Sequence, residues 1–76
     1  MSEFDEALDA KNLHCPLPIL RAKKALKRLE SEQVLKITAT DPSTMQDFVS
    51  FCKHAGHELL LSEAVADEFV FLIKKV

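Results

Sequence analysis

The stretch Leu13-His14-Cys15-Pro16-Leu17-Pro18 decides the fold of this 76-residue chain, because it divides a short acidic segment from a long basic one. It holds one of the two cysteines and two of the three prolines. Proline is tolerated in the first turn of a helix, since the N–H that it lacks would have no partner there. The sequence therefore predicts a helix from Pro16 to Leu29, with Cys15 as its N-cap residue.

This predicted helix has an apolar side and a cationic side. At about 100° per residue, one arc collects Ile19, Ala22, Ala25, Leu26 and Leu29. Residues 21–28 include five basic side chains and no acidic one, although the chain has a net charge of −2. Such a concentration of charge indicates a surface for a partner. The residues expected to dock that partner are two leucines inside the cationic arc and three of its basic residues: Leu17, Leu20, Arg21, Lys23 and Lys24.

The remaining elements are predicted from their apolar patterns and from the N-cap, proline and glycine residues at their ends. Residues 5–9 predict a first strand, and the β-branched run 34–40 predicts a second. Asp41 and Pro42 are expected to open a second helix, as its N-cap and first residue, and Gly56 to end it after Ala55 in a left-handed conformation. The apolar runs 58–62 and 69–73 predict two more strands, joined as a hairpin across 64–68.

The resulting order, βαβαββ, predicts an α/β fold: a two-layer sandwich with two helices packed on one face of a four-stranded mixed sheet. With 47% hydrophobic residues, the chain is expected to form a single domain over residues 1–76. No apolar run reaches membrane-spanning length, and the acidic start does not resemble a signal peptide. We therefore expect a cytoplasmic protein with no membrane partner.

Cys15 is the predicted chemical centre. A thiolate at a helix N-terminus near cations has a pKa below its usual value of about 8.5. Here Arg21 and His14 are the nearest cationic candidates. Thiolate is a nucleophile whose sulfur can accept a further sulfur atom as a persulfide. Packing of an inert thiol inside the fold is the alternative.

Cys52 is interpreted differently, as a small hydrophobic core residue. It falls on the apolar side of the second helix, and a role as a resolving thiol is the less favoured interpretation. The residues expected to share that side are Met45, Phe48, Val49 and Ala55. The histidines show no ligand spacing with the cysteines, so no metal site is predicted, and no bound cofactor is expected.

Three function classes remain open at this point. The first is covalent sulfur transfer through Cys15, by a shuttle protein more than by a self-contained enzyme. The second is a regulatory module that docks protein or RNA through the basic helix. Without Trp or Tyr, direct sequence-specific nucleic-acid binding is not expected. The third is a thiol redox protein, which the absence of a CxxC pair disfavours.

The motif Cys15-Pro16-Leu17-Pro18 before a basic helix resembles the CPxP signature of the TusA/SirA-type sulfur-carrier family. The resemblance extends over nearly the whole chain. Its further positions are Ala7-Leu8-Asp9-Ala10 with Leu13, Asp41-Pro42-Ser43-Thr44, Asp47 with Phe51-Cys52, and His57-Glu58-Leu59.

The resemblance implies that Cys15 carries a persulfide, and that Pro16 and Pro18 form the motif and the helix start. It further implies that a cysteine desulfurase donates the sulfur and that a downstream relay protein accepts it. Uses known in the family include tRNA thiolation, molybdenum-cofactor enzymes and sulfur oxidation. Some members have an acidic residue at the position of Leu17 and an arginine at that of His14, which leaves the downstream pathway open.

Overall fold

Six elements follow one another in the computed structural model, which describes residues 4–76. Their bounds are Glu6–Ala10 for β1, Leu17–Arg28 for α1, Val34–Ala39 for β2, Thr44–Ala55 for α2, Glu58–Val65 for β3 and Glu68–Lys74 for β4. The predicted βαβαββ order is confirmed. Most boundaries agree within one or two residues, including the start of α2 at Thr44 rather than Pro42. The β3 strand departs further, because it continues to Val65 rather than ending at residue 62.

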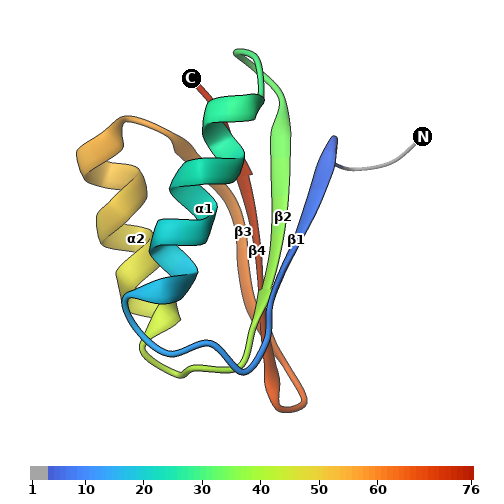
Figure 1. The fold of residues 1–76 in the computed structure, drawn as a ribbon, viewed down its shortest axis with the longest axis vertical. Coiled ribbons are helices and arrows are strands. Elements are labelled where there is room, and N and C mark those ends of the chain that lie inside the picture. Colours follow the sequence, from blue (N-terminus) through green and yellow to red (C-terminus); the bar gives the residue numbers. More distant parts are fainter. Residues whose placement is uncertain (1–3) are drawn as a thin grey trace.

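The four strands form one mixed sheet in the order β1-β2-β4-β3. The β1 and β2 strands are parallel, whereas β2–β4 and β4–β3 are antiparallel, with an irregularity between Leu59 and Leu61. Both helices cover the same face of the sheet (Figure 1). The predicted two-layer α/β sandwich is therefore confirmed.

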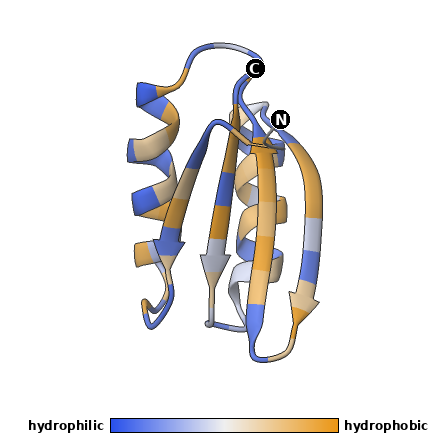
Figure 2. Ribbon diagram, turned by 90° about the vertical axis from the view of Figure 1, so that its right-hand side faces the viewer, coloured by the Kyte–Doolittle hydropathy of each residue, from blue (hydrophilic) through white to orange (hydrophobic). Residues whose placement is uncertain are grey.

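The core lies between the sheet and the two helices. Alternate residues of β2 (Leu35, Ile37 and Ala39) are fully buried, as strand geometry requires of a sheet covered on one face. Across the layer, the rings of Phe48 and Phe71 lie 4.7 Å apart between centroids. Hydrophilic and hydrophobic residues alternate along α1 (Figure 2), because the helix has one buried side.

The β3–β4 hairpin is tighter than predicted. Val65 pairs with Glu68, so only Ala66 and Asp67 lie in the turn, and Ala66 has a φ of 56°. The left-handed end of α2 is confirmed, since Gly56 has a φ of 80° and its N–H donates to the Cys52 carbonyl at 2.9 Å. Within residues 4–76, no helix has the length and apolar character needed to cross a membrane.

Candidate functional site

The loop between β1 and α1 (residues 11–16), called the Cys15 loop below, lies beside the loop between β2 and α2 (residues 40–43). Both are at the same end of the molecule (Figure 1). Because β1 and β2 are parallel neighbours, the segments that follow them leave the same edge of the sheet. Two hydrogen bonds join these segments: Asn12 N–H donates to Thr40 Oγ1 at 2.9 Å, and Cys15 N–H donates to Asp41 Oδ2 at 2.9 Å. The backbone at Cys15 is thereby fixed by residues 26 positions further along the chain.

Asp41 is the anchor of this junction. While Oδ2 accepts the Cys15 N–H, Oδ1 accepts both the N–H and the hydroxyl of Ser43, each at 3.0 Å. The Ser43 N–H, the Cys15 N–H and the Ser43 hydroxyl lower the pKa of Asp41, and the charge of His14 acts in the same direction. Asp41 is therefore held in its ionised form.

Asp41 and Pro42 do not open α2 in the predicted way. The helix begins at Thr44, with Ser43 in the N-cap position. The Asp41 carbonyl accepts the Thr44 N–H at 3.0 Å and the Thr44 hydroxyl at 2.6 Å. The prediction was wrong because the Asp41 side chain is engaged by the turn and by Cys15, on the other loop.

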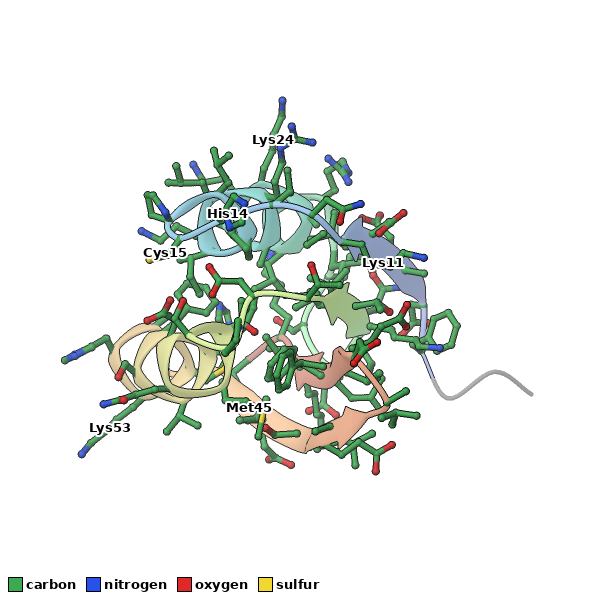
Figure 3. All side chains as sticks on the ribbon, turned by 90° about the horizontal axis from the view of Figure 1, so that it is seen from below. Lys11, His14, Cys15, Lys24, Met45 and Lys53 are labelled. Atoms are coloured by element: carbon green, nitrogen blue, oxygen red, sulfur yellow. The ribbon has the colours of Figure 1, made fainter. Side chains whose placement is uncertain are left out.

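The prediction that Cys15 caps α1 was also wrong. Pro16 occupies the N-cap position without a capping side-chain hydrogen bond, and the Cys15–Pro16 peptide bond is cis. The Leu17 N–H, which an N-cap side chain at Cys15 would accept, donates instead to the His14 carbonyl at 2.8 Å. Pro18, in the first turn of α1, is buried. The thiol is therefore not engaged in capping, and Cys15 is exposed (Figure 3).

Carboxylates, not cations, dominate the surroundings of the Cys15 thiol. Its pKa is raised, first by a hydrogen bond to the Asp47 side chain, then by desolvation and by the charges of Asp47 and Asp41. The expectation of a lowered pKa was therefore wrong for the free chain. That expectation rested on the cations of α1, whereas the carboxylates that raise the pKa of Cys15 lie in α2 and in the loop before α2.

Asp47 is the site residue that sequence reasoning missed. It was recognised as a position typical of the family but was given no role. It lies in the first turn of α2, where a carboxylate suits the helix dipole. Its Oδ2 is buried and meets no partner in hydrogen-bond geometry among the described residues. An acidic residue so close to the start of a predicted helix was the available signal, but only the tertiary structure places it at Cys15.

Cys52 lies in the core, as predicted. It is 3% exposed, and burial raises the pKa of its thiol to about 11. Phe48 is fully buried on the same side of α2, and Met45 packs against the core. Val49 and Ala55 are exposed, so their predicted place on this side was wrong. Of the two free thiols, only that of Cys15 is accessible.

The five residues predicted to dock a partner are all exposed on α1. Leu17 and Leu20 expose 43% and 51% of their surface, so both leave large apolar side chains on the cationic side of α1. Lys24 projects from α1 into solvent, away from the Cys15 loop (Figure 3). Their role in docking stays a prediction.

Leu20 and Lys24 separate two surface grooves. One groove, of about 450 Å³, is lined by α1 and α2 residues together with the C-terminal segment, among them Lys27, Phe51, His57 and Lys75. The other, of about 650 Å³, lies toward β1 and includes Leu8, Leu17, Arg21 and Arg28. The sequence did not predict that residues of α2 and the C-terminus would share the cationic surface of α1. Among the described residues there is no cluster of three or more side chains that could hold a metal ion.

The fold and the site together define a class: a two-layer α/β protein that presents one exposed thiol on a loop fixed by a carboxylate. Comparison with known proteins shows which family within this class the chain resembles. The family model described as sulfurtransferase TusA matches residues 6–75. The sulfur carrier protein TusA of Allochromatium vinosum is 53% identical over 75 residues, which cover 99% of each chain.

Two further comparisons agree. A putative sulfur carrier protein of Bacillus subtilis, YrkI, is 45% identical over 71 residues, or 93% of this chain and 95% of the relative. The crystal structure of a SirA-like protein from Desulfitobacterium hafniense has a TM-score of 0.80 at 25% identity, covering 92% of this chain and 96% of that one. The chain belongs to the TusA family.

Proposed function

We propose that this protein is a sulfur carrier that accepts sulfane sulfur on Cys15 as a persulfide and passes it to an acceptor protein. The observation that carries the proposal is the contrast between the two thiols of a TusA-family chain. Cys15 is exposed on a hydrogen-bonded loop, whereas Cys52 is buried in the core. A cysteine desulfurase is the proposed donor, and the cytoplasm is the proposed location.

The loading step needs one nucleophilic sulfur and no resident cofactor. The Cys15 sulfur attacks the outer sulfur of the donor persulfide, a new S–S bond forms, and the bond within the donor breaks. The donor's inner sulfur leaves as a thiolate and takes up the proton that Cys15 has lost. The net exchange converts thiol plus persulfide into persulfide plus thiol, so no oxidant or reductant is consumed.

The α1 surface supports docking of an acidic partner. Exposed Leu20 lies among cationic side chains, and apolar anchors surrounded by charge are typical of protein interfaces. A partner with acidic residues around a small apolar pocket would fit this surface. Delivery to tRNA thiolation, to molybdenum-cofactor enzymes or to another sulfur pathway would follow from which acceptor binds here.

Intact mass after loading tests the proposal. The protein is incubated with a cysteine desulfurase, cysteine and pyridoxal phosphate, and we expect a gain of one sulfur atom. Cys15→Ser should abolish the gain, while Cys52→Ala should retain it. Alanine is the better control at position 52 because a serine hydroxyl would be buried there. Absence of any gain in the wild-type chain would contradict the proposal and favour a docking module.

A further inference from the structure

The groove between α1 and α2, called the α1–α2 groove below, combines apolar and cationic side chains. Its volume of about 450 Å³ falls within the range of about 300–1,000 Å³ that is typical of ligand pockets. The apolar part of its lining comes from the two helices: Leu20, Leu26, Phe51 and Ala55. The polar part is basic throughout: Lys23, Lys24, Lys27, His57 and Lys75. No aspartate or glutamate of residues 4–76 lines it.

The lysines of the α1–α2 groove are not neutralised by the chain itself. Two ion pairs form among residues 4–76, one from Arg28 and one from Lys74, and neither includes a lysine of this groove. Lys23 and Lys27 are four positions apart on α1, where like charges repel and destabilise a helix. Uncompensated positive charge beside an apolar surface indicates an occupant that is both anionic and partly apolar.

The C-terminal side of the α1–α2 groove is held in place by contacts within the chain. Lys75 Nζ donates to the Leu29 carbonyl at 2.6 Å, and an ammonium has further N–H groups to donate to an anion. His57 Nδ1 accepts the Val76 N–H at 3.3 Å, and the rings of His57 and Phe51 lie 5.9 Å apart between centroids. An occupant would therefore meet a site that is already ordered, which lowers the entropic cost of binding.

We propose that the α1–α2 groove binds a short acidic segment of a partner protein, with an apolar side chain of that segment seated between the two helices. The carboxylates of the segment would face the lysines. Leu20 and Lys27 are about 10 Å apart along the axis of α1, which gives room for about three residues of an extended segment. The inference rests on the proposed carrier function and deepens it, because a carrier must be recognised by the proteins that load and unload it.

A peptide fits this groove better than single-stranded RNA does. RNA-binding sites of that kind present exposed aromatic faces on which bases stack. Here Phe51 is half-buried against the core and the ring of His57, and no other aromatic side chain of residues 4–76 lines the groove. The leucine and alanine side chains of the lining match an apolar side chain instead.

The position of the α1–α2 groove separates recognition from chemistry. The C-terminal ends of α1 and α2 lie at the end of the molecule opposite the Cys15 loop (Figure 1). Lys27 and Ala55, which line the groove, belong to those ends, and none of residues 11–16 lines it. A segment bound there therefore leaves the Cys15 sulfur accessible to a second surface of the same partner.

The first test measures binding of a fluorescent peptide that contains two leucines among glutamates, by fluorescence anisotropy at low salt. We expect saturable binding that weakens as the ionic strength rises. Replacing the leucines by alanine, or the glutamates by glutamine, should each weaken binding at least about threefold, because each change removes one part of the match. An oligouridylate of equal charge that bound more tightly than the peptide would contradict the assignment of a peptide occupant.

A pair of charge reversals tests where the peptide binds. Lys27→Glu should weaken binding at least about threefold, because an attraction becomes a repulsion, and Lys27→Gln should have a smaller effect in the same direction. Lys53→Glu is the matched control: Lys53 is exposed in the last turn of α2, as Lys27 is in that of α1, but it lines neither groove. It should bind as the wild type does. Circular dichroism shows whether each variant retains the fold.

Two readouts on the wild-type chain test the separation from Cys15. The amide NMR signals of Lys27, Phe51 and Ala55 should shift on titration with the peptide, while the rate of Cys15 alkylation by iodoacetamide stays unchanged. Equal weakening by Lys27→Glu and Lys53→Glu would overturn the inference, and so would a bound peptide that blocks alkylation. None of these assays uses a sulfur donor. A chain that binds the peptide in the groove but cannot be loaded by a desulfurase would contradict the proposed function alone, and one that is loaded but ignores the peptide would contradict the groove assignment alone.

Discussion

At the scale of single residues, the two cysteines show how strongly the environment decides what a thiol does. Cys15 is exposed, and neighbouring carboxylates raise its pKa. Cys52 is 3% exposed, and desolvation raises its pKa to about 11. The sequence separated the two correctly, because helical periodicity places Cys52 on an apolar side. It did not predict the sign of the pKa shift at Cys15, which depends on an aspartate 32 positions away.

Cys52 should make the stability of the protein depend on alkaline pH. Its pKa is about 11 in the folded chain and 9.0 as the reference value, so between these values the folded state holds a proton that the unfolded state has lost. The free energy of unfolding should therefore fall as the pH rises from 9 to 11, by at most about 1.4 kcal/mol per pH unit from this thiol. Urea unfolding at several pH values measures the slope.

Cys52→Ala provides the comparison, because other groups also titrate in this range. The alanine variant should show a shallower decline than the wild type, although it starts from a lower stability. Equal slopes in the two proteins would contradict the assignment of this titration to Cys52.

At the scale of elements, the sequence predicted both helices and all four strands but placed two helix starts wrongly. The apolar arc of α1 and the β-branched pattern of β2 are local signals, so they could be read from a short window. The helix starts depend on the hydrogen bonds from Asn12 to Thr40 and from Cys15 to Asp41, which span 28 and 26 positions. No local pattern contains these partners, and the same distant contacts build the site.

The cationic side of α1 gives a prediction at this scale. Lys24→Glu should slow sulfur loading from a desulfurase about fivefold to tenfold at low salt, because complementary charge mainly accelerates association. Loading rates followed by intact mass measure the effect. The difference from the wild type should narrow as the ionic strength rises and the Debye length falls.

Lys36→Glu makes the same change of charge on β2, outside both grooves that border Lys24. It should load at nearly the wild-type rate. If the two variants were slowed equally, net charge alone would account for the result, and the docking role of α1 would be contradicted.

At the scale of the whole molecule, the site and the core are built from different parts of the fold. Cys15, Asp41 and Asp47 lie on two loops and one helical turn at one end, while the core runs between the sheet and the helices (Figure 1). Phe48 and Phe71 are fully buried and lie 4.7 Å apart between ring centroids, so they link α2 to β4 at the centre of the molecule. The core therefore sets how much of the chain is folded, and the loops set the chemistry of the folded fraction.

Substitutions at Phe71 test this separation. For 76 residues, a stability of about 4–11 kcal/mol is expected. Phe71→Ala should cost about 3–5 kcal/mol, because it removes a fully buried ring, and a wild-type stability near the lower end of the expected range would then leave a large unfolded fraction. Phe71→Leu should cost less, about 1–2 kcal/mol, and stay folded at 25 °C. Leu60→Ala, at a position that is 45% exposed on β3, should change the melting temperature little.

The informative measurement combines thermal unfolding with the pH midpoint of Cys15 alkylation. In Phe71→Leu the melting temperature should fall while the midpoint stays at the wild-type value, because the folded fraction keeps Asp47 against the thiol. In Phe71→Ala the unfolded fraction should react with the midpoint of an ordinary cysteine, and both thiols should become alkylated. A shifted midpoint in a fully folded Phe71→Leu protein would show instead that core packing tunes the site, since the position of α2 would then depend on the ring.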